Sequence, residues 1–113
     1  MITNIMKELE FQDFIILIGK NKYENASLLE NADPHDYWIH IKDYSSGHVI
    51  IKNPRRKKVP TNVIKRACCI LKSSNSRCKS IKNLEFCVAK RESLTLTTIL
   101  GEVIVENSKN ITI

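Results

Sequence analysis

Residues 36–58 read DYWIHIKDYSSGHVIIKNPRRKK, in which two alternating apolar segments flank a short polar turn. β-Branched and aromatic residues in alternation are typical of half-buried strands, and the Asp and Ser at 43–46 are typical of a turn. We therefore predict an antiparallel pair of strands over 37–42 and 47–52. If Lys42 pairs with His48, then His40 lies opposite Ile50 and Trp38 lies opposite Lys52.

Cross-strand partners share one face of a sheet, so this register divides the side chains into two sets. Ile39, Ile41, Val49 and Ile51 form one face, which we predict to be core. The other face carries Trp, two His and two Lys beside the basic run at 55–58, and this combination suits a polyanion with bases to stack on. The members of that second face are Trp38, His40, Lys42, His48 and Lys52.

Each aromatic on the second face also has a simpler interpretation. A helix packed over the face would make Trp38 a core residue, because a single Trp is usually buried. His40 can bond a neighbouring backbone carbonyl, and His48 can hold the turn after Ser46-Gly47. The sequence leaves these alternatives open.

Charge is unevenly placed along the chain. Residues 52–91 hold thirteen Lys or Arg against the single Glu85, a net charge of +12, whereas residues 1–51 have a net charge of −4 and residues 92–113 of −2. A localised positive field of this size is expected of a protein that binds nucleic acid or another anionic surface. A solvated basic segment that only aids solubility is the alternative.

Length and composition predict a single domain over residues 1–113. The chain is 42% hydrophobic and 27% charged, which is ordinary for a globular protein. No apolar run approaches the roughly 20 residues of a membrane-spanning helix, and the N-terminus does not resemble a signal peptide, so we expect a cytoplasmic protein. The four cysteines lack a C-x-x-C spacing, and we expect reduced, mostly buried thiols.

Periodicity outside the central stretch predicts two helices and several more strands. A first hairpin spans 8–19 with a tight turn at Gln12-Asp13, and its all-apolar second strand suits burial on both faces. A helix follows to about Ala32, with Asn21 as N-cap and Glu24 at the capping-box position. We expect its inward residues to be Tyr23, Ala26, Leu28 and Leu29.

The second helix should begin near Pro60 or Thr61, bury Ile64, Ala67, Cys68 and Leu71, and stop within 73–76. Further strands are expected over 84–88, 101–106 and 111–113, while 91–99 is either a strand or a loop. The predicted fold class is α+β: a mostly antiparallel sheet with two helices in one compact domain, both helices packed on one face.

Signatures of enzymes and metal sites are absent from the sequence. It contains no Gly-rich phosphate loop, no G-x-S-x-G elbow and no H-E-x-x-H motif. A histidine–carboxylate–serine set near the 43–46 turn is easily assembled by chance, and three histidines do not converge in the predicted strand pair. We therefore expect no catalytic residues, no metal and no cofactor.

The order of several motifs resembles the NFACT RNA-binding domain family. In that family a strand ends in Gly-Arg/Lys-Asn, a helix opens with a Gln/Glu-Asn pair, and a D-x-W-L-H strand precedes a G-S-H-V-like strand. The corresponding residues here are 14–19, Lys20-Asn21, Glu24-Asn25, Asp36, Trp38-Ile39-His40 and 47–51. The segment GKNKYEN also looks like the version in a eukaryotic coiled-coil-containing relative. The likeness is strong over about residues 11–53 and looser beyond.

This resemblance implies a stand-alone RNA-binding module for transfer RNA or ribosomal RNA, linked to translation or ribosome quality control. The other regions of the family's larger members have no room in these 113 residues, so their tailing of stalled chains is not carried over. A protein-interaction adaptor and a DNA-binding module are the alternatives. The predicted nucleic-acid-binding residues are Trp38, His40, Lys42, His48, Lys52, Arg55, Arg56, Lys57, Lys58, Lys65, Lys72, Lys90 and Arg91.

Overall fold

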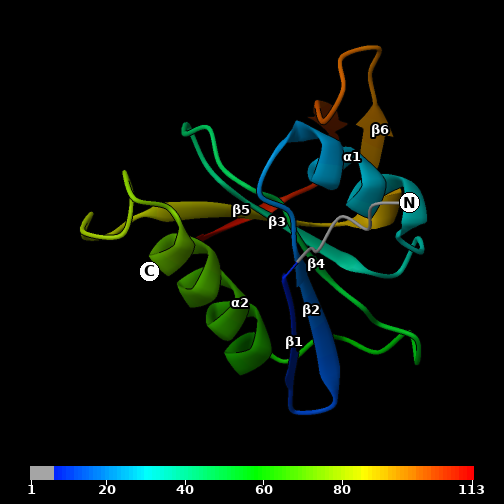
Figure 1. The fold of residues 1–113 in the computed structure, drawn as a ribbon. Coiled ribbons are helices and arrows are strands. Elements are labelled where there is room, and N and C mark those ends of the chain that lie inside the picture. Colours follow the sequence, from blue (N-terminus) through cyan, green and yellow to red (C-terminus); the bar gives the residue numbers. More distant parts are fainter. Residues whose placement is uncertain (1–6) are drawn as a thin grey trace.

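The computed structural model describes residues 7–113 and confirms an α+β domain (Figure 1). A six-stranded antiparallel sheet has the order β1-β2-β4-β3-β5-β8, and β6 and β7 form a separate two-stranded sheet. The elements are β1 (Lys7–Phe11), β2 (Phe14–Ile18), α1 (Lys22–Asn31), β3 (Tyr37–Ile41), β4 (Val49–Ile51), α2 (Thr61–Ser74), β5 (Glu85–Lys90), the 3-10 helix η1 (Arg91–Ser93), β6 (Leu94–Leu96), β7 (Val103–Val105) and β8 (Lys109–Thr112).

The first hairpin forms as predicted, because its turn residues accept the left-handed conformation. Gln12 and Asp13 have φ values of 49° and 68° between the paired residues Phe11 and Phe14. Positive φ at both central residues matches the right-handed twist of the flanking strands, which is why two-residue hairpins use it. The hairpin places β2 beside β4, at the centre of the domain.

Helix α1 begins with the predicted cap. The Asn21 side-chain oxygen accepts hydrogen bonds from the backbone N–H groups of Tyr23 and Glu24, at 3.0 and 2.9 Å. The Glu24 carboxylate accepts the N–H of Lys20 at 2.9 Å, one residue before the position of an ideal capping box. The helix ends at Asn31, ahead of the Asp33-Pro34 pair that disfavours helical geometry.

The inward face of α1 includes Ala26, Leu28 and Leu29, as predicted. The prediction for Tyr23 is wrong, because that side chain is 63% exposed. Glu24 and Asn25 are also buried, and at about 100° per residue the buried set centres on a direction nearly opposite to Tyr23. The side of α1 that faces the sheet therefore includes polar as well as apolar residues.

The register of β3 and β4 differs from the prediction by two residues. Trp38 pairs with Ile50 and Ile39 with Val49, whereas Lys42 and His48 lie in a wide connection outside the ladder. The connection runs from residue 42 to residue 48 and is therefore longer than the predicted four-residue turn; within it the Ser46 hydroxyl accepts the Ile41 N–H at 3.4 Å. A shift of two residues keeps every side chain on its predicted face, since the side-chain period of a strand is two.

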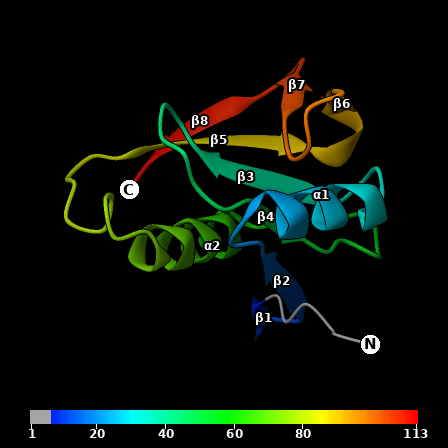
Figure 2. The ribbon, with the colours of Figure 1, turned by 45° about the horizontal axis from the view of Figure 1, so that its top comes forward.

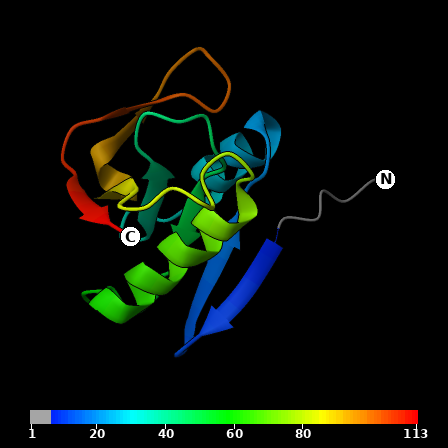
Figure 3. The same ribbon diagram turned by 90° about the vertical axis from the view of Figure 1, so that its left-hand side faces the viewer.

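The prediction that both helices pack on one face is wrong, because each face of the sheet carries its own core. On one face Ile16, Ile39 and Ile51 pack with Val63, Ala67, Cys68 and Leu71 of α2. On the other face Trp38 and Ile50 pack with Leu28 and Leu29 of α1. Figure 1 shows α1 and α2 on opposite sides of β3 and β5, and Figures 2 and 3 show the same arrangement from two other directions. The strands are apolar at both odd and even positions, so both faces have to be covered.

The remaining elements follow the sequence closely. Helix α2 ends at Ser74 within the predicted segment, although Val63 is fully buried and Ile64 only partly. Residues 91–99, undecided from the sequence, form η1 and β6 before a loop.

All four cysteines are free thiols, with Cys68 and Cys78 buried. Within residues 7–113, neither helix is long and apolar enough to cross a bilayer.

Candidate nucleic-acid interface

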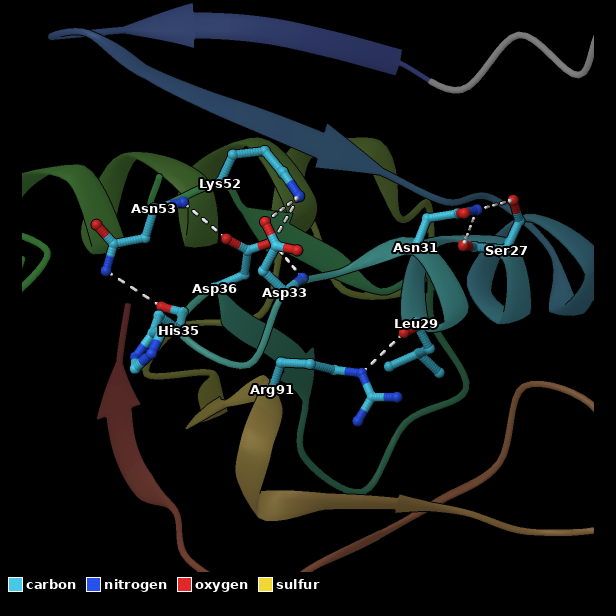
Figure 4. A network of polar contacts seen from close by, with 9 residues as sticks. All are labelled: Ser27, Leu29, Asn31, Asp33, His35, Asp36, Lys52, Asn53 and Arg91. Atoms are coloured by element: carbon cyan, nitrogen blue, oxygen red, sulfur yellow. Dashed lines mark hydrogen bonds and ion pairs between the residues drawn. The ribbon is translucent and has the colours of Figure 1, made fainter. Parts of the chain in front are cut away.

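A buried carboxylate organises the end of β4. Asp36 is fully buried, and its Oδ2 lies 2.7 Å from the Lys52 ammonium while its Oδ1 accepts the Asn53 N–H at 2.8 Å (Figure 4). Oδ2 also accepts the Asp33 N–H at 2.9 Å. A buried charge is tolerated only when it is paired and hydrogen-bonded, and Asp36 meets both conditions. The predicted phosphate ligand Lys52 is consequently held in an internal ion pair.

A buried amide next to this ion pair shapes the basic loop, which we define as residues 54–58. The Asn53 side chain is 4% exposed; its Nδ2 donates to the carbonyls of His35 and Lys57, at 3.1 and 2.6 Å. Its Oδ1 accepts the Lys57 N–H at 3.2 Å, and its backbone carbonyl accepts the Arg56 N–H at 3.0 Å. The side-chain amide of Asn53 therefore holds the backbone of the basic loop in a defined conformation.

The basic loop presents its cations to solvent. Arg55, Arg56, Lys57 and Lys58 are all exposed, and none takes part in an ion pair within residues 7–113. Four adjacent positive charges without acidic neighbours repel one another, and bound anions relieve that repulsion. The arginines can grip phosphate oxygens with two hydrogen bonds each, whereas the lysines act as point charges.

The rings of Trp38, His40 and His48 form a compact cluster. Trp38 stacks on His40 with centroids 5.8 Å apart and planes 4° from parallel, and His48 meets both rings edge-on at 5.4 and 5.0 Å. Trp38 is 2% exposed and His48 6%, while His40 is half-buried. The core interpretation of Trp38 therefore holds: α1 covers the ring, and a base cannot stack on it in this conformation.

Burial also changes the acid–base properties of this cluster. Desolvation and the neighbouring His40 lower the pKa of His48 from 6.5 to about 3, and desolvation lowers the pKa of His40. Both imidazoles are neutral at physiological pH and offer no charge to a phosphate. The His48 backbone N–H donates to the Asn25 side chain at 2.9 Å, which links β4 to α1. Trp38 and His48 are therefore core residues in this structure.

The other predicted cations fall into two groups. Arg91 is half-buried and donates to the carbonyls of Leu29 and Leu94, at 2.8 and 3.2 Å, and Lys72 donates to the Ile113 carbonyl at 3.0 Å. Lys42 is exposed, 3.8 Å from Glu85. Lys65 and Lys90 are exposed and form no ion pair in the described part of the chain. Among the predicted cations, those with neither an ion pair nor a side-chain hydrogen bond within residues 7–113 are therefore the four of the basic loop together with Lys65 and Lys90.

Asn53 is the residue whose importance the sequence did not reveal. It occupies an unremarkable Asn-Pro pair ahead of the basic run, a combination that signals a turn. That signal predicts a loop but not a buried amide, because the carbonyls of His35 and Lys57 reach Asn53 only after folding.

Residues 7–113 contain no group of three or more His, Cys, Asp or Glu placed to hold a metal ion.

One family model matches nearly the whole chain. The family model for the NFACT protein RNA binding domain matches residues 4–108. The coiled-coil domain-containing protein 25 homolog of Dictyostelium discoideum is 30% identical over 66 residues, covering 56% of this chain and 32% of that protein. Coiled-coil domain-containing protein 25 of Mus musculus is 37% identical over 46 residues, covering 41% and 22% respectively. The matches therefore span about a third or less of these relatives.

A solved structure shares the fold over the whole chain. The C-terminal part of the fibronectin/fibrinogen-binding protein from Streptococcus suis superposes with a TM-score of 0.86 at 21% identity. The superposition covers 100% of this chain and 46% of that one. At this identity the likeness shows the fold alone.

Proposed function

Because this chain belongs to the NFACT RNA-binding domain family, we propose that it binds structured RNA, such as transfer RNA or ribosomal RNA, through the basic loop. The family is an RNA-binding one and not a catalytic one. The observation that supports the site is the anchoring of the loop: Asp36 and Asn53 hold its backbone while its four cations remain exposed and unpaired within residues 7–113.

The physical basis of binding in this proposal is phosphate neutralisation. Each phosphate that Arg55, Arg56, Lys57 or Lys58 neutralises releases condensed counterions, so affinity depends steeply on salt concentration. A loop with a fixed backbone loses little conformational entropy on binding, which favours affinity for a duplex of defined shape. Lys65 and Lys90 extend the surface, and Lys90 lines a groove together with Lys58 of the loop. Lys42 and the half-buried His40 lie toward the end of β3 that is away from the loop, next to Glu85 and Cys87 of β5. Trp38, His48, Lys52, Lys72 and Arg91 contribute by holding the scaffold.

The biological setting in this proposal is translation. Ribosomes and transfer RNA supply the structured RNA in the cytoplasm, and ribosome quality control is the process that the family resemblance favours. The activities of the longer relatives are not assigned to this chain, since the matched regions span only part of those proteins.

A salt-titrated binding assay tests the proposal with transfer RNA, a ribosomal RNA stem-loop and a matched DNA duplex. We expect one RNA to be preferred and the preference to persist at roughly 150 mM salt, because 2′-hydroxyl and shape contacts distinguish RNA from DNA. The double variant Arg55→Glu, Arg56→Glu should bind that RNA at least tenfold more weakly, since each lost phosphate contact reduces the salt slope by about one.

A matched control variant is Lys79→Glu, Lys82→Glu, which changes the net charge equally at two exposed positions outside the loop. Equal weakening by both double variants would show a diffuse polyanion effect and refute the assignment to the basic loop. Equal, salt-labile binding to all three nucleic acids would refute specific RNA binding.

A further inference from the structure

A groove with a volume of about 610 Å³ opens on the α2 face of the sheet. It lies between the segment from Lys58 to Ile64 and strands β5 and β8, and we call it the α2–β8 groove. The groove exists because α2 packs mainly against β2, β3 and β4, so that Val88 and Ile111 of β5 and β8 are only partly covered, whereas Phe86 of β5 is fully buried. Its volume falls within the roughly 300–1,000 Å³ typical of sites for small ligands.

The floor of the groove is apolar. Tyr37, Val59, Ile64, Val88 and Ile111 line it from three parts of the fold. The Tyr37 hydroxyl accepts the Val59 N–H at 3.4 Å, which joins the sheet to the segment ahead of α2. Successive residues of a strand point to opposite faces, so Tyr37 faces this groove while Trp38 faces α1. The groove therefore offers the aromatic and aliphatic contact that the buried Trp38 does not.

The rim of the groove is mainly cationic. Lys58, Lys90 and Lys109 line it from the basic loop, β5 and β8, and none forms an ion pair within residues 7–113. Glu92 is the one acidic residue among the lining residues. Helix α2 also begins here with Thr61, and no acidic residue lies in its first turn. An apolar floor beneath three unpaired ammonium groups complements a planar base with an attached phosphate.

We propose that the α2–β8 groove binds one unpaired nucleotide of the RNA, with its base on the apolar floor and its phosphate at Lys58, Lys90 and Lys109. The inference rests on the proposed function, because the RNA backbone that contacts the basic loop leads into the groove at Lys58, which belongs to both. The RNA recognised is then a duplex with a bulged or terminal nucleotide. Unpaired bases are also the part of RNA that proteins read most readily.

Two RNA hairpins with the same stem, one carrying a single-nucleotide bulge, test the proposal by fluorescence anisotropy. Contact of one base with a protein surface is worth roughly a five- to 150-fold gain in affinity, so the wild-type protein should prefer the bulged hairpin by at least fivefold. The double variant Lys90→Gln, Lys109→Gln should reduce that preference to less than twofold. Glu92→Gln should increase it, because the one anionic group on the rim is removed.

Two controls separate this groove from the basic loop. Lys82→Gln removes an exposed lysine that does not line the groove and should leave the preference unchanged. The variant Arg55→Glu, Arg56→Glu should weaken both hairpins by a similar factor and leave their ratio intact. All the variants replace exposed side chains, so an unchanged melting temperature verifies that each is folded.

The outcomes distinguish the two proposals. Equal wild-type affinity for both hairpins, or a bulge preference that persists in Lys90→Gln, Lys109→Gln, would overturn the groove assignment while RNA binding by the basic loop stands. No measurable binding of either hairpin even at roughly 50 mM salt would refute the proposed function, and the groove assignment with it.

Discussion

Replacing Asp36 by Asn tests the central structural claim, that one buried carboxylate anchors the basic loop. The change keeps the shape of the side chain and removes its charge. Asp36 is fully buried, and it accepts hydrogen bonds from Lys52, Asn53 and Asp33 at 2.7, 2.8 and 2.9 Å. In the variant the Lys52 ammonium loses its buried partner and keeps only the exposed Asp33 carboxylate, 3.7 Å away. The new side-chain amide also carries an NH2 group, which faces one of the donors that the carboxylate had accepted.

The magnitude follows from burial. Breaking a fully buried ion pair by removing one partner costs about 3–5 kcal/mol, but the Lys52 side chain is 27% exposed and water replaces part of the lost interaction. One mismatched donor adds about 1 kcal/mol. We expect a loss of about 3 kcal/mol in the free energy of unfolding, and a melting temperature lower by about 10 °C.

Urea unfolding followed by far-ultraviolet circular dichroism measures this loss. Asp33→Asn is the matched control, because the Asp33 carboxylate lies 3.7 Å from Lys52 and its side chain is 69% exposed. That variant should change the free energy of unfolding by less than about 0.5 kcal/mol. A loss below about 1 kcal/mol for Asp36→Asn, or equal losses for the two variants, would refute the anchoring role of Asp36.

Four further predictions address the core, the histidines, the thiols and the surface. Trp38→Ala should lower the free energy of unfolding by about 3–5 kcal/mol and His40→Ala by clearly less, since Trp38 is 2% exposed and His40 half-buried; comparable losses in urea unfolding would contradict the core role. The pKa of His48 is lowered to about 3, so the unfolded chain binds an extra proton below pH 6.5; stability is full above that pH and declines as pH falls toward 3, by about 2 kcal/mol at pH 5, and His48→Gln should flatten this decline. A thiol reagent at neutral pH should modify the exposed Cys69 first and spare Cys68, whose pKa burial raises to about 12; rapid reaction of Cys68 in the folded protein would contradict the packing of α2. Tyr23→Ala should change the melting temperature little, because that side chain is 63% exposed.

The two proposed RNA contacts rely on different parts of the same architecture. The basic loop depends on Asn53 and Asp36 at the end of β4, whereas the α2–β8 groove depends on where α2 crosses the sheet. Lys58 is common to both. Variants of the anchoring residues should therefore disturb the loop, while changes at Lys90 and Lys109 should act mainly on the preference for a bulged hairpin.

The sequence alone determined the local structure. The Gln12-Asp13 turn, the Asn21 cap and the end of α2 near Ser74 each rest on interactions between residues a few positions apart. The division of β3 and β4 into two faces was also predictable, and it survived a two-residue error in register because the strand period is two. The charge of the basic loop and the order of the family's motifs required no structure either.

Only the tertiary structure decided what covers each face and which cations are free. The hydrophobic effect is non-directional, so an apolar face on Trp38 and Ile50 specifies burial but not the helix that supplies it. Helix α1 covers this face, so Trp38 is a core residue and not the base-stacking surface that the sequence left open. Folding likewise brought Asp36 to Lys52, sixteen residues away, and left Lys58, Lys90 and Lys109 around one groove. Contacts between distant segments set these outcomes, and no short-range pattern encodes them.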